Sequence, residues 1–159
     1  MDAYFTPAEC TCASCQAMCM ESTCMPTPAE ARALMRAGHA LRLARYEPRG
    51  TDEHAFVAPA PRGLEGATLR TTNSGRCTFL SAGRCELHGS GLKPMEGRLA
   101  LHDRPWPLVR KQVYVTWSGR RYASVRAMLD KEMAAPSTAG LSVAPDENGS
   151  ALTAITSGA

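Results

Sequence analysis

The spacing of the cysteines limits the possible folds of this chain more than any other feature. The chain has 159 residues and seven cysteines. Five of them fall within fifteen residues near the N-terminus, namely Cys10, Cys12, Cys15, Cys19 and Cys24. The other two are Cys77 and Cys85. Because an odd number of thiols cannot all pair within one chain, this pattern favours metal or redox chemistry over a disulfide framework.

The expected compartment supports the same interpretation. Residues 1–9 contain neither a basic segment nor an apolar run of the kind found in secretory signals, so we expect no such signal. No stretch approaches the 18 or so apolar residues that span a bilayer, so we also expect no membrane association. We therefore expect a cytoplasmic protein. In that reducing compartment, closely spaced cysteines bind metals more often than they form disulfides.

Large apolar side chains are scarce, which limits the core. Leu, Ile, Val and Phe together number 24, or 15% of the chain. Such a composition with a high net charge is typical of disorder, but the net charge here is only +3. We therefore expect a small, thinly packed fold. Folds of this kind often need a metal, a disulfide or a partner to reach stability.

Local signals predict two helices. Thr27, Pro28 and Glu30 form a capping box with proline at the first helical position, so a helix should begin there. Glu47-Pro48 should end it at the latest, since the residue before a proline avoids helical geometry. A second helix is predicted over 124–133, where apolar residues recur at helical spacing.

Strands and loops are predicted from the remaining patterns. Residues 76–80 and 84–88 should form a hairpin around a glycine-containing turn. Alternating apolar residues predict another strand over 112–117, with a tight turn at Ser118-Gly119. Residues 1–26 are rich in cysteine and poor in aliphatic residues, so we expect them to be loop-like.

These elements together predict a small α+β fold, loop-rich and held together by a metal, with a hairpin, one N-terminal helix and one C-terminal helix. Residues 1–133 should form the cysteine-cluster domain. From residue 134 onward the chain is rich in Ala, Ser and Gly and has no Lys, Arg, Cys or aromatic residue. We therefore expect residues 134–159 to be a disordered tail.

The candidate metal ligands fall into two groups along the chain. Cys12 and Cys15 have the two-residue spacing of a metal knuckle, and Cys19 follows one helical turn later. In the middle of the chain, the hairpin should join two cysteines, with a histidine three residues after the second. The predicted ligands are Cys12, Cys15, Cys19, Cys77, Cys85 and His88, with Cys10, Cys24 and His102 as further candidates.

We predict one metal site shared by both groups. Cys77, Cys85 and His88 supply only three ligands, whereas a closed tetrahedral site needs four. A shared site also closes a loop of about sixty residues, and closing a long loop removes more unfolded-state entropy than closing a short one. The alternative is a purely N-terminal site formed by Cys10, Cys12 and the next two cysteines, although the first two leave each other little room.

Three motifs resemble a known family. They are Cys12-x2-Cys15-x3-Cys19, then Cys77-Thr78-Phe79-Leu80 with Gly83-Arg84-Cys85-Glu86-Leu87-His88, and Lys93-Pro94-Met95-Glu96-Gly97-Arg98. They resemble the YkgJ-type cysteine-cluster family, which is described as a zinc- or iron-chelating domain. The resemblance covers roughly residues 10–102. It implies a metal site to which Cys12, Cys15, Cys19, Cys77 and Cys85 contribute.

One departure from the family pattern concerns the third motif. Many members carry a further cysteine immediately before the arginine, where this chain has Gly97 before Arg98. The corresponding ligand is either lost or replaced by His88, His102 or a spare N-terminal cysteine.

Three functions are compatible with these observations. The first is a protein that binds zinc or iron, with the ion at least structural; structural zinc contributes on the order of 10–16 kcal/mol in small domains. The second is an enzyme that uses an iron–sulfur cluster or non-haem iron in redox chemistry or protein modification. The third is a zinc-supported adaptor that binds nucleic acid or protein through an arginine-rich face. No catalytic motif distinguishes these alternatives, so whether the protein is an enzyme remains open.

Overall fold

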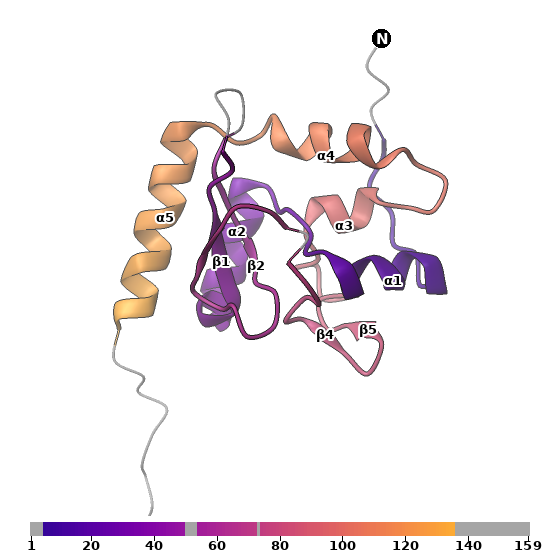
Figure 1. Ribbon diagram of the computed structural model, residues 1–159, viewed down its shortest axis with the longest axis horizontal. Coiled ribbons are helices and arrows are strands. Elements are labelled where there is room, and N and C mark those ends of the chain that lie inside the picture. Colours follow the sequence, from indigo (N-terminus) through magenta and orange to yellow (C-terminus); the bar gives the residue numbers. More distant parts are fainter. Residues whose placement is uncertain (1–4, 50–53, 73, 136–159) are drawn as a thin grey trace, which may run out of the picture.

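The computed structural model describes residues 5–49, 54–72 and 74–135 (Figure 1). Its helices are α1 (Ala13–Glu21), α2 (Pro28–Leu34), α3 (Met95–Leu99), α4 (Trp106–Tyr114) and α5 (Gly119–Ala134). Its strands are β1 (Leu43–Tyr46), β2 (Phe56–Pro59), β3 (Thr68–Leu69), β4 (Leu80–Ser81) and β5 (Arg84–Cys85). This mixture of helices and short strands confirms the predicted α+β class.

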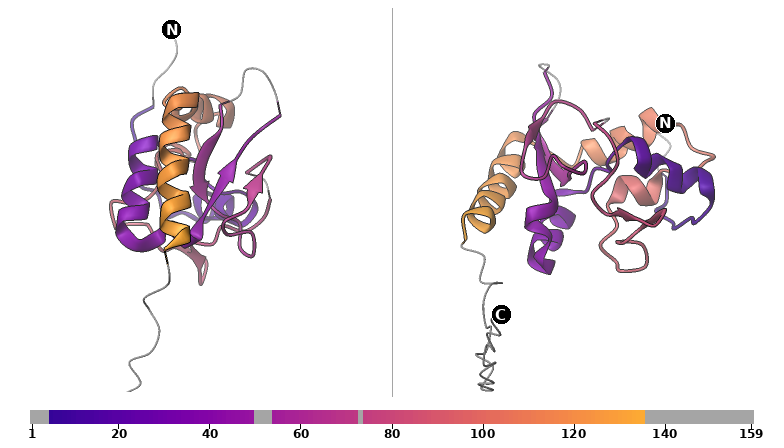
Figure 2. Two further views of the ribbon diagram at one scale, coloured as in Figure 1. Left: turned by 90° about the vertical axis from the view of Figure 1, so that its left-hand side faces the viewer. Right: turned by 60° about the horizontal axis from the view of Figure 1, so that its bottom comes forward.

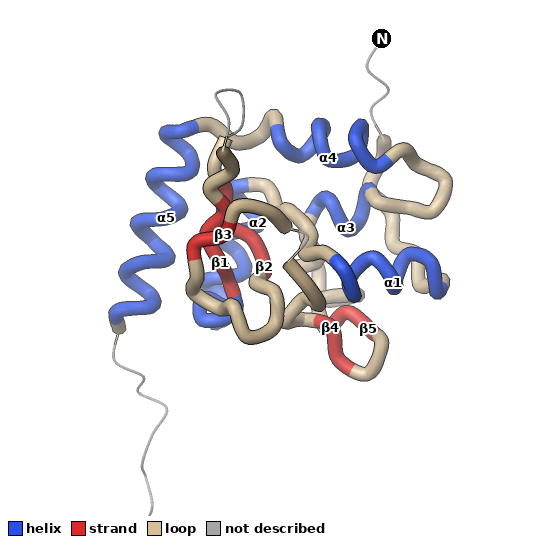
Figure 3. Tube along the Cα trace, viewed as in Figure 1, coloured by secondary structure: helices blue, strands red, loops and turns tan. Residues whose placement is uncertain are grey.

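The strands form two small sheets. In the first, β1 is central and pairs antiparallel with β2 and parallel with β3. In the second, β4 and β5 form a hairpin in which Leu80 pairs with Cys85. The first sheet lies between α5 on one side and α1 and α3 on the other (Figure 3). Helices α2 and α5 contact each other and β2 (Figure 2).

Helix α2 begins as predicted and ends earlier. The Thr27 hydroxyl accepts a hydrogen bond from the Glu30 amide, and the Glu30 carboxylate accepts one from the Thr27 amide, so the capping box is confirmed. The helix ends at Leu34, well before Glu47-Pro48, which agrees with the latest end that the sequence predicts. Gly38 adopts a φ of +86°, which stops the regular helix, and after a π turn and a 3-10 turn the chain enters β1.

The prediction of a strand over 112–117 is wrong, because the first three residues belong to α4 and the rest form a turn and an irregular connection to α5. Val113 and Trp117 fit both the helical period and the strand period, because they are four residues apart and also lie on the same side of an alternating pattern. Val115, which the strand would bury between them, is 62% exposed. Ser118 caps α5 by accepting the Arg121 amide and so is not part of a hairpin turn. The second predicted helix is confirmed within the longer α5.

Two other local predictions are partly correct. Residues 1–26 are not all loop, since α1 occupies nine of them. The hairpin is confirmed but shorter than expected, because only two residues of each arm pair. Cys77 instead forms an isolated bridge with Pro61.

The core has its largest buried side chains around the first sheet. Trp117, Tyr46 and Phe79 are almost completely buried, and Tyr46 stacks on Phe56 with ring centroids 4.9 Å apart. The Trp117 indole donates a hydrogen bond to the Pro26 carbonyl, which fixes the chain just before α2. This core therefore supports the chain where the cysteine-rich segment ends, just before α2.

The predicted boundary at residue 133 stays a prediction, because the proposed tail beyond residue 135 lies outside the described residues. Within the described ranges, no helix combines the length and apolar character required to cross a membrane.

Candidate metal centre

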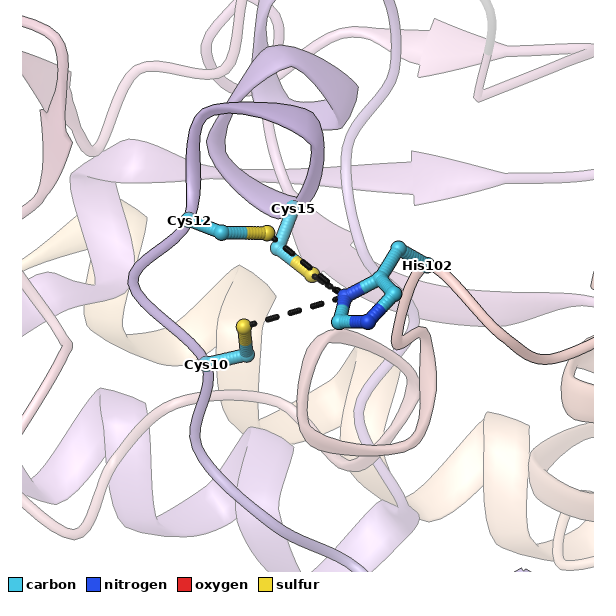
Figure 4. A group of neighbouring side chains, drawn as sticks. All are labelled: Cys10, Cys12, Cys15 and His102. Atoms are coloured by element: carbon cyan, nitrogen blue, oxygen red, sulfur yellow. Dashed lines mark hydrogen bonds between the residues drawn. The ribbon is translucent and has the colours of Figure 1, made fainter.

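Three cysteines and one histidine converge near the N-terminus of α1 (Figure 4). The Nδ1 atom of His102 lies 3.6 Å from the Cys12 sulfur, 3.7 Å from that of Cys15 and 4.0 Å from that of Cys10. All four candidate ligand atoms lie within 4.8 Å of one another. Cys12 and His102 are exposed, and Cys10 and Cys15 are partly buried. The group could therefore hold a metal ion that is reachable from solvent.

These distances match the edges of a tetrahedral coordination shell. Zinc binds thiolate sulfur at about 2.3 Å and imidazole nitrogen at about 2.0–2.1 Å. In a regular tetrahedron those bond lengths put sulfur and nitrogen about 3.6 Å apart, and two sulfurs about 3.8 Å apart. The three sulfur–nitrogen distances, 3.6 to 4.0 Å, lie at or slightly above the first value. Only small adjustments would be needed to coordinate an ion.

The start of α1 places the two knuckle cysteines. Cys12 is the N-cap residue, in an extended conformation, and Cys15 lies in the first helical turn. The Gln16 amide donates to the Cys12 carbonyl, which closes that turn. The two cysteines therefore turn toward the same point in front of the helix (Figure 4).

A strap formed by residues 5–9 carries Cys10 to the loop that holds His102. The Ala8 amide donates to the Arg98 carbonyl on α3, and the Gln112 side chain on α4 exchanges two hydrogen bonds with the backbone of Phe5. In the α3–α4 loop, Arg104 donates to the Thr6 and Leu99 carbonyls. These bonds hold two segments together that are about ninety residues apart in sequence.

The two knuckle thiols differ in acidity. The backbone amide of Cys15 is the main influence on the Cys12 thiol, and it lowers the pKa of Cys12 to about 6. The geometry of this contact falls short of a capping hydrogen bond. Burial is the main influence that raises the pKa of Cys15 to about 11. Near neutral pH, Cys12 is therefore mostly thiolate. Metal binding would have to displace the proton of Cys15, since a thiol coordinates in its deprotonated form.

The remaining cysteines gather separately. Cys19, one turn after Cys15 on α1, is buried with Cys24 and Cys77, and Cys85 on β5 is partly buried. All four line one small cavity together with Lys93. Among the described residues, the cluster of Cys10, Cys12, Cys15 and His102 alone brings three or more candidate ligand atoms within 4.8 Å of one another. The structure thus divides the predicted ligands between two places.

Burial and neighbouring thiols raise the pKa of three cysteines of the second group, namely Cys19, Cys77 and Cys85. The neighbouring Cys24 thiol is the main influence that raises the pKa of Cys19 to about 12, and burial raises that of Cys77 to about 12. The Cys19 thiol likewise raises the pKa of Cys85 far above its usual range. Their protons would all have to leave before these sulfurs could bind an ion.

His88 lies between the two groups. It lines a hollow of about 380 Å³ with Cys10, Cys15, Cys19 and Cys85. Its Nε2 atom is 3.5 Å from the Glu9 carboxylate. In the structure His88 thus has a carboxylate neighbour and borders both groups.

Comparison with protein-family models, curated proteins and solved structures finds no match to this chain. The resemblance to the YkgJ-type family therefore stays a prediction. Sequence reasoning ranked Cys10 and His102 below the other candidates. Only their position in the fold shows that they accompany Cys12 and Cys15, because no spacing rule connects a histidine to cysteines that lie 87 to 92 residues earlier.

Proposed function

We propose that this protein binds one transition-metal ion through Cys10, Cys12, Cys15 and His102. The observation that supports this function best is the convergence of four soft or borderline ligand atoms within 4.8 Å. Such a cluster of thiols has no evident role in packing, because Cys12 and His102 are exposed and bury little apolar surface.

The ligand set favours zinc, with iron as the second choice. Thiolate and imidazole are the usual ligands of zinc, and three cysteines with one histidine form a common closed zinc site. Iron also accepts this ligand type. Either ion agrees with the zinc- or iron-chelating role that the family resemblance implies.

The ion would be at least structural. Its ligands come from the strap, from α1 and from the α3–α4 loop, so one ion would join three segments. Exposure of Cys12 and His102 would also let solvent chelators reach it. Four protein ligands leave no open coordination position, and therefore a structural or exchangeable ion is supported better than a catalytic one.

The first test is anaerobic purification followed by elemental analysis and an absorption spectrum. Replacing zinc by Co²⁺ should give absorption bands typical of a tetrahedral ion with three sulfur ligands and one nitrogen ligand. An iron–sulfur cluster would instead give a brown protein.

Ligand variants provide the second test. His102→Asn and Cys12→Ser should each weaken binding at this site by more than about 100-fold, because even partners outside the coordination shell account for 10–100-fold in affinity. His54→Asn is the matched control, since His54 is exposed and stacks on Tyr114 away from the cluster. Metal affinity in both ligand variants equal to that of the control would refute the proposal.

A further inference from the structure

We infer that the chain has a second metal site, formed by Cys19, Cys24, Cys77 and Cys85, which would take a soft divalent ion such as zinc. This inference does not depend on the first site, because the two groups share no ligand. It would make the protein a two-metal protein, with one exposed site of mixed ligands and one buried site of thiolates alone.

The first observation is the size and lining of the cavity between these four residues. It measures about 10 Å³ and is lined by all four cysteines, with Lys93 and apolar residues completing the wall. That volume corresponds to about one water-sized sphere. A single ion fits such a space, whereas an iron–sulfur cluster or an organic ligand does not.

The second observation is how the four residues approach one another. The Cys19 thiol interacts with the thiols of Cys24 and Cys85, and the Cys77 thiol is close enough to interact electrostatically with those of Cys19 and Cys85. The Cys77 amide also donates to the Cys19 carbonyl at 2.9 Å, which ties the two backbones together. Cys19 is therefore the centre of the group.

The third observation is that the fold makes room for the Cys24 sulfur. Gly97 on α3 faces it, and a Cβ atom at that position would lie 3.1 Å from the sulfur. Two backbone-directed bonds hold the adjacent Met25 against α3: its amide donates to the Glu96 carboxylate and its carbonyl accepts the Glu96 amide. These bonds to the next residue place Cys24 beside the cavity.

The fourth observation is the charge next to the site. Lys93 lines the cavity and is only 8% exposed. A divalent ion bound by four thiolates carries two net negative charges, and a buried ammonium is stabilised by negative charge beside it. The buried Lys93 side chain therefore lies beside the charge that an occupied site would carry.

Binding would require the sulfurs to move closer together, since they lie less tightly than those of the first group. Two of the four ligands lie where such adjustment is easy. Cys24 follows α1 in an irregular segment, and Cys85 lies on a hairpin with only two paired residues in each strand. A site of this kind tightens when the ion binds, and it joins α1, the hairpin and the segment before α2.

The test uses the full-length wild-type protein loaded with ¹¹³Cd²⁺, whose NMR shift depends on the number of sulfur ligands. Two resonances are expected, one at the position of four sulfur ligands and one at the position of three sulfurs and one nitrogen. Loss of the second resonance alone would contradict the proposed function but support this inference. Absence of the four-sulfur resonance would overturn the inference, whatever the state of the other site.

Zinc stoichiometry in variants gives an independent readout. The wild type should hold two ions per chain, Cys12→Ser one and Cys85→Ser one. If Cys85→Ser keeps the wild-type ratio of zinc to protein, two sites are excluded. They are also excluded if either single substitution releases all the zinc. Circular dichroism in the far ultraviolet identifies a variant that has failed to fold, and in that case the wild-type cadmium spectrum decides.

Discussion

Glu96 offers the sharpest test of the packing around the proposed metal sites. Its side chain on α3 is completely buried. One carboxylate oxygen accepts the Met25 amide. The other has no hydrogen-bond partner among the described residues and lies 3.8 Å from the Arg110 guanidinium. Burial outweighs these favourable contacts and raises the pKa of Glu96 from 4.5 to about 7.

The raised pKa of Glu96 makes the folded state less stable as the pH rises. Because the pKa of Glu96 is higher in the folded state, its contribution to stability is fully present below pH 4.5 and is lost as the pH rises through about 7. At 1.36 kcal/mol for each pH unit, the difference amounts to about 3 kcal/mol. Glu96→Gln cannot ionise but keeps an oxygen for the Met25 amide, so the variant should lack this loss.

The pH dependence is measured by urea unfolding of the wild type and of Glu96→Gln from pH 5 to pH 8, at equal metal loading. The free energy of unfolding of Glu96→Gln relative to the wild type should increase by roughly 2–3 kcal/mol over that interval. Contributions common to both proteins, including protonation of the metal-binding thiols, cancel in the difference. The control is Glu86→Gln: Arg42 lowers the pKa of this exposed carboxyl, so its effect should be constant above pH 5. A constant difference for Glu96→Gln as well would refute the reasoning.

Three further predictions concern other parts of the chain. Thr27→Ala should lower the free energy of unfolding by about 1 kcal/mol in urea titrations, since it removes the side-chain half of the capping box that starts α2. Gly97→Ala should weaken the four-sulfur cadmium resonance more than the other, because the added methyl group would lie 3.1 Å from the Cys24 sulfur. A chain ending at Ala135 should keep the metal content and melting temperature of the full-length protein, since the remaining residues have no Lys, Arg, Cys or aromatic side chain.

The sequence predicted those parts of the fold that depend on neighbouring residues. The capping box before α2 and the turn between β4 and β5 are local, and both are present. The segment 112–117 was misread because its apolar residues satisfy two periods at once. Burial of Val113 and Trp117 against distant elements, with Val115 exposed, selects the helix. The choice between helix and strand thus depends on tertiary contacts, and the segment alone does not reveal it.

Short-range sequence patterns likewise predict only part of the candidate site. The spacing of Cys12 and Cys15 was sufficient to suggest a metal, but not to choose the partner. His102 reaches them because the strap binds α3 and α4, and none of those bonds has a sequence signature. Likewise, nothing local places Cys24 against Gly97, although the missing side chain at that glycine is what leaves space for the sulfur.

Helix α1 carries ligands of both proposed sites, and this predicts that the two ions assist each other. The helix has nine residues, and Cys19 is its single buried side chain. Isolated helices of this length are marginal in water, so anchoring at its ends should decide whether α1 is ordered. An ion held by Cys12 and Cys15 anchors its start, and an ion held by Cys19 anchors its last turns. The first ion bound would order the helix, and the second would then bind without that cost. Zinc affinity at the exposed site, measured by competition with a chelator, should therefore be lower in Cys85→Ser than in the wild type. Equal affinities would show that the remaining packing orders α1 without help from the buried ion.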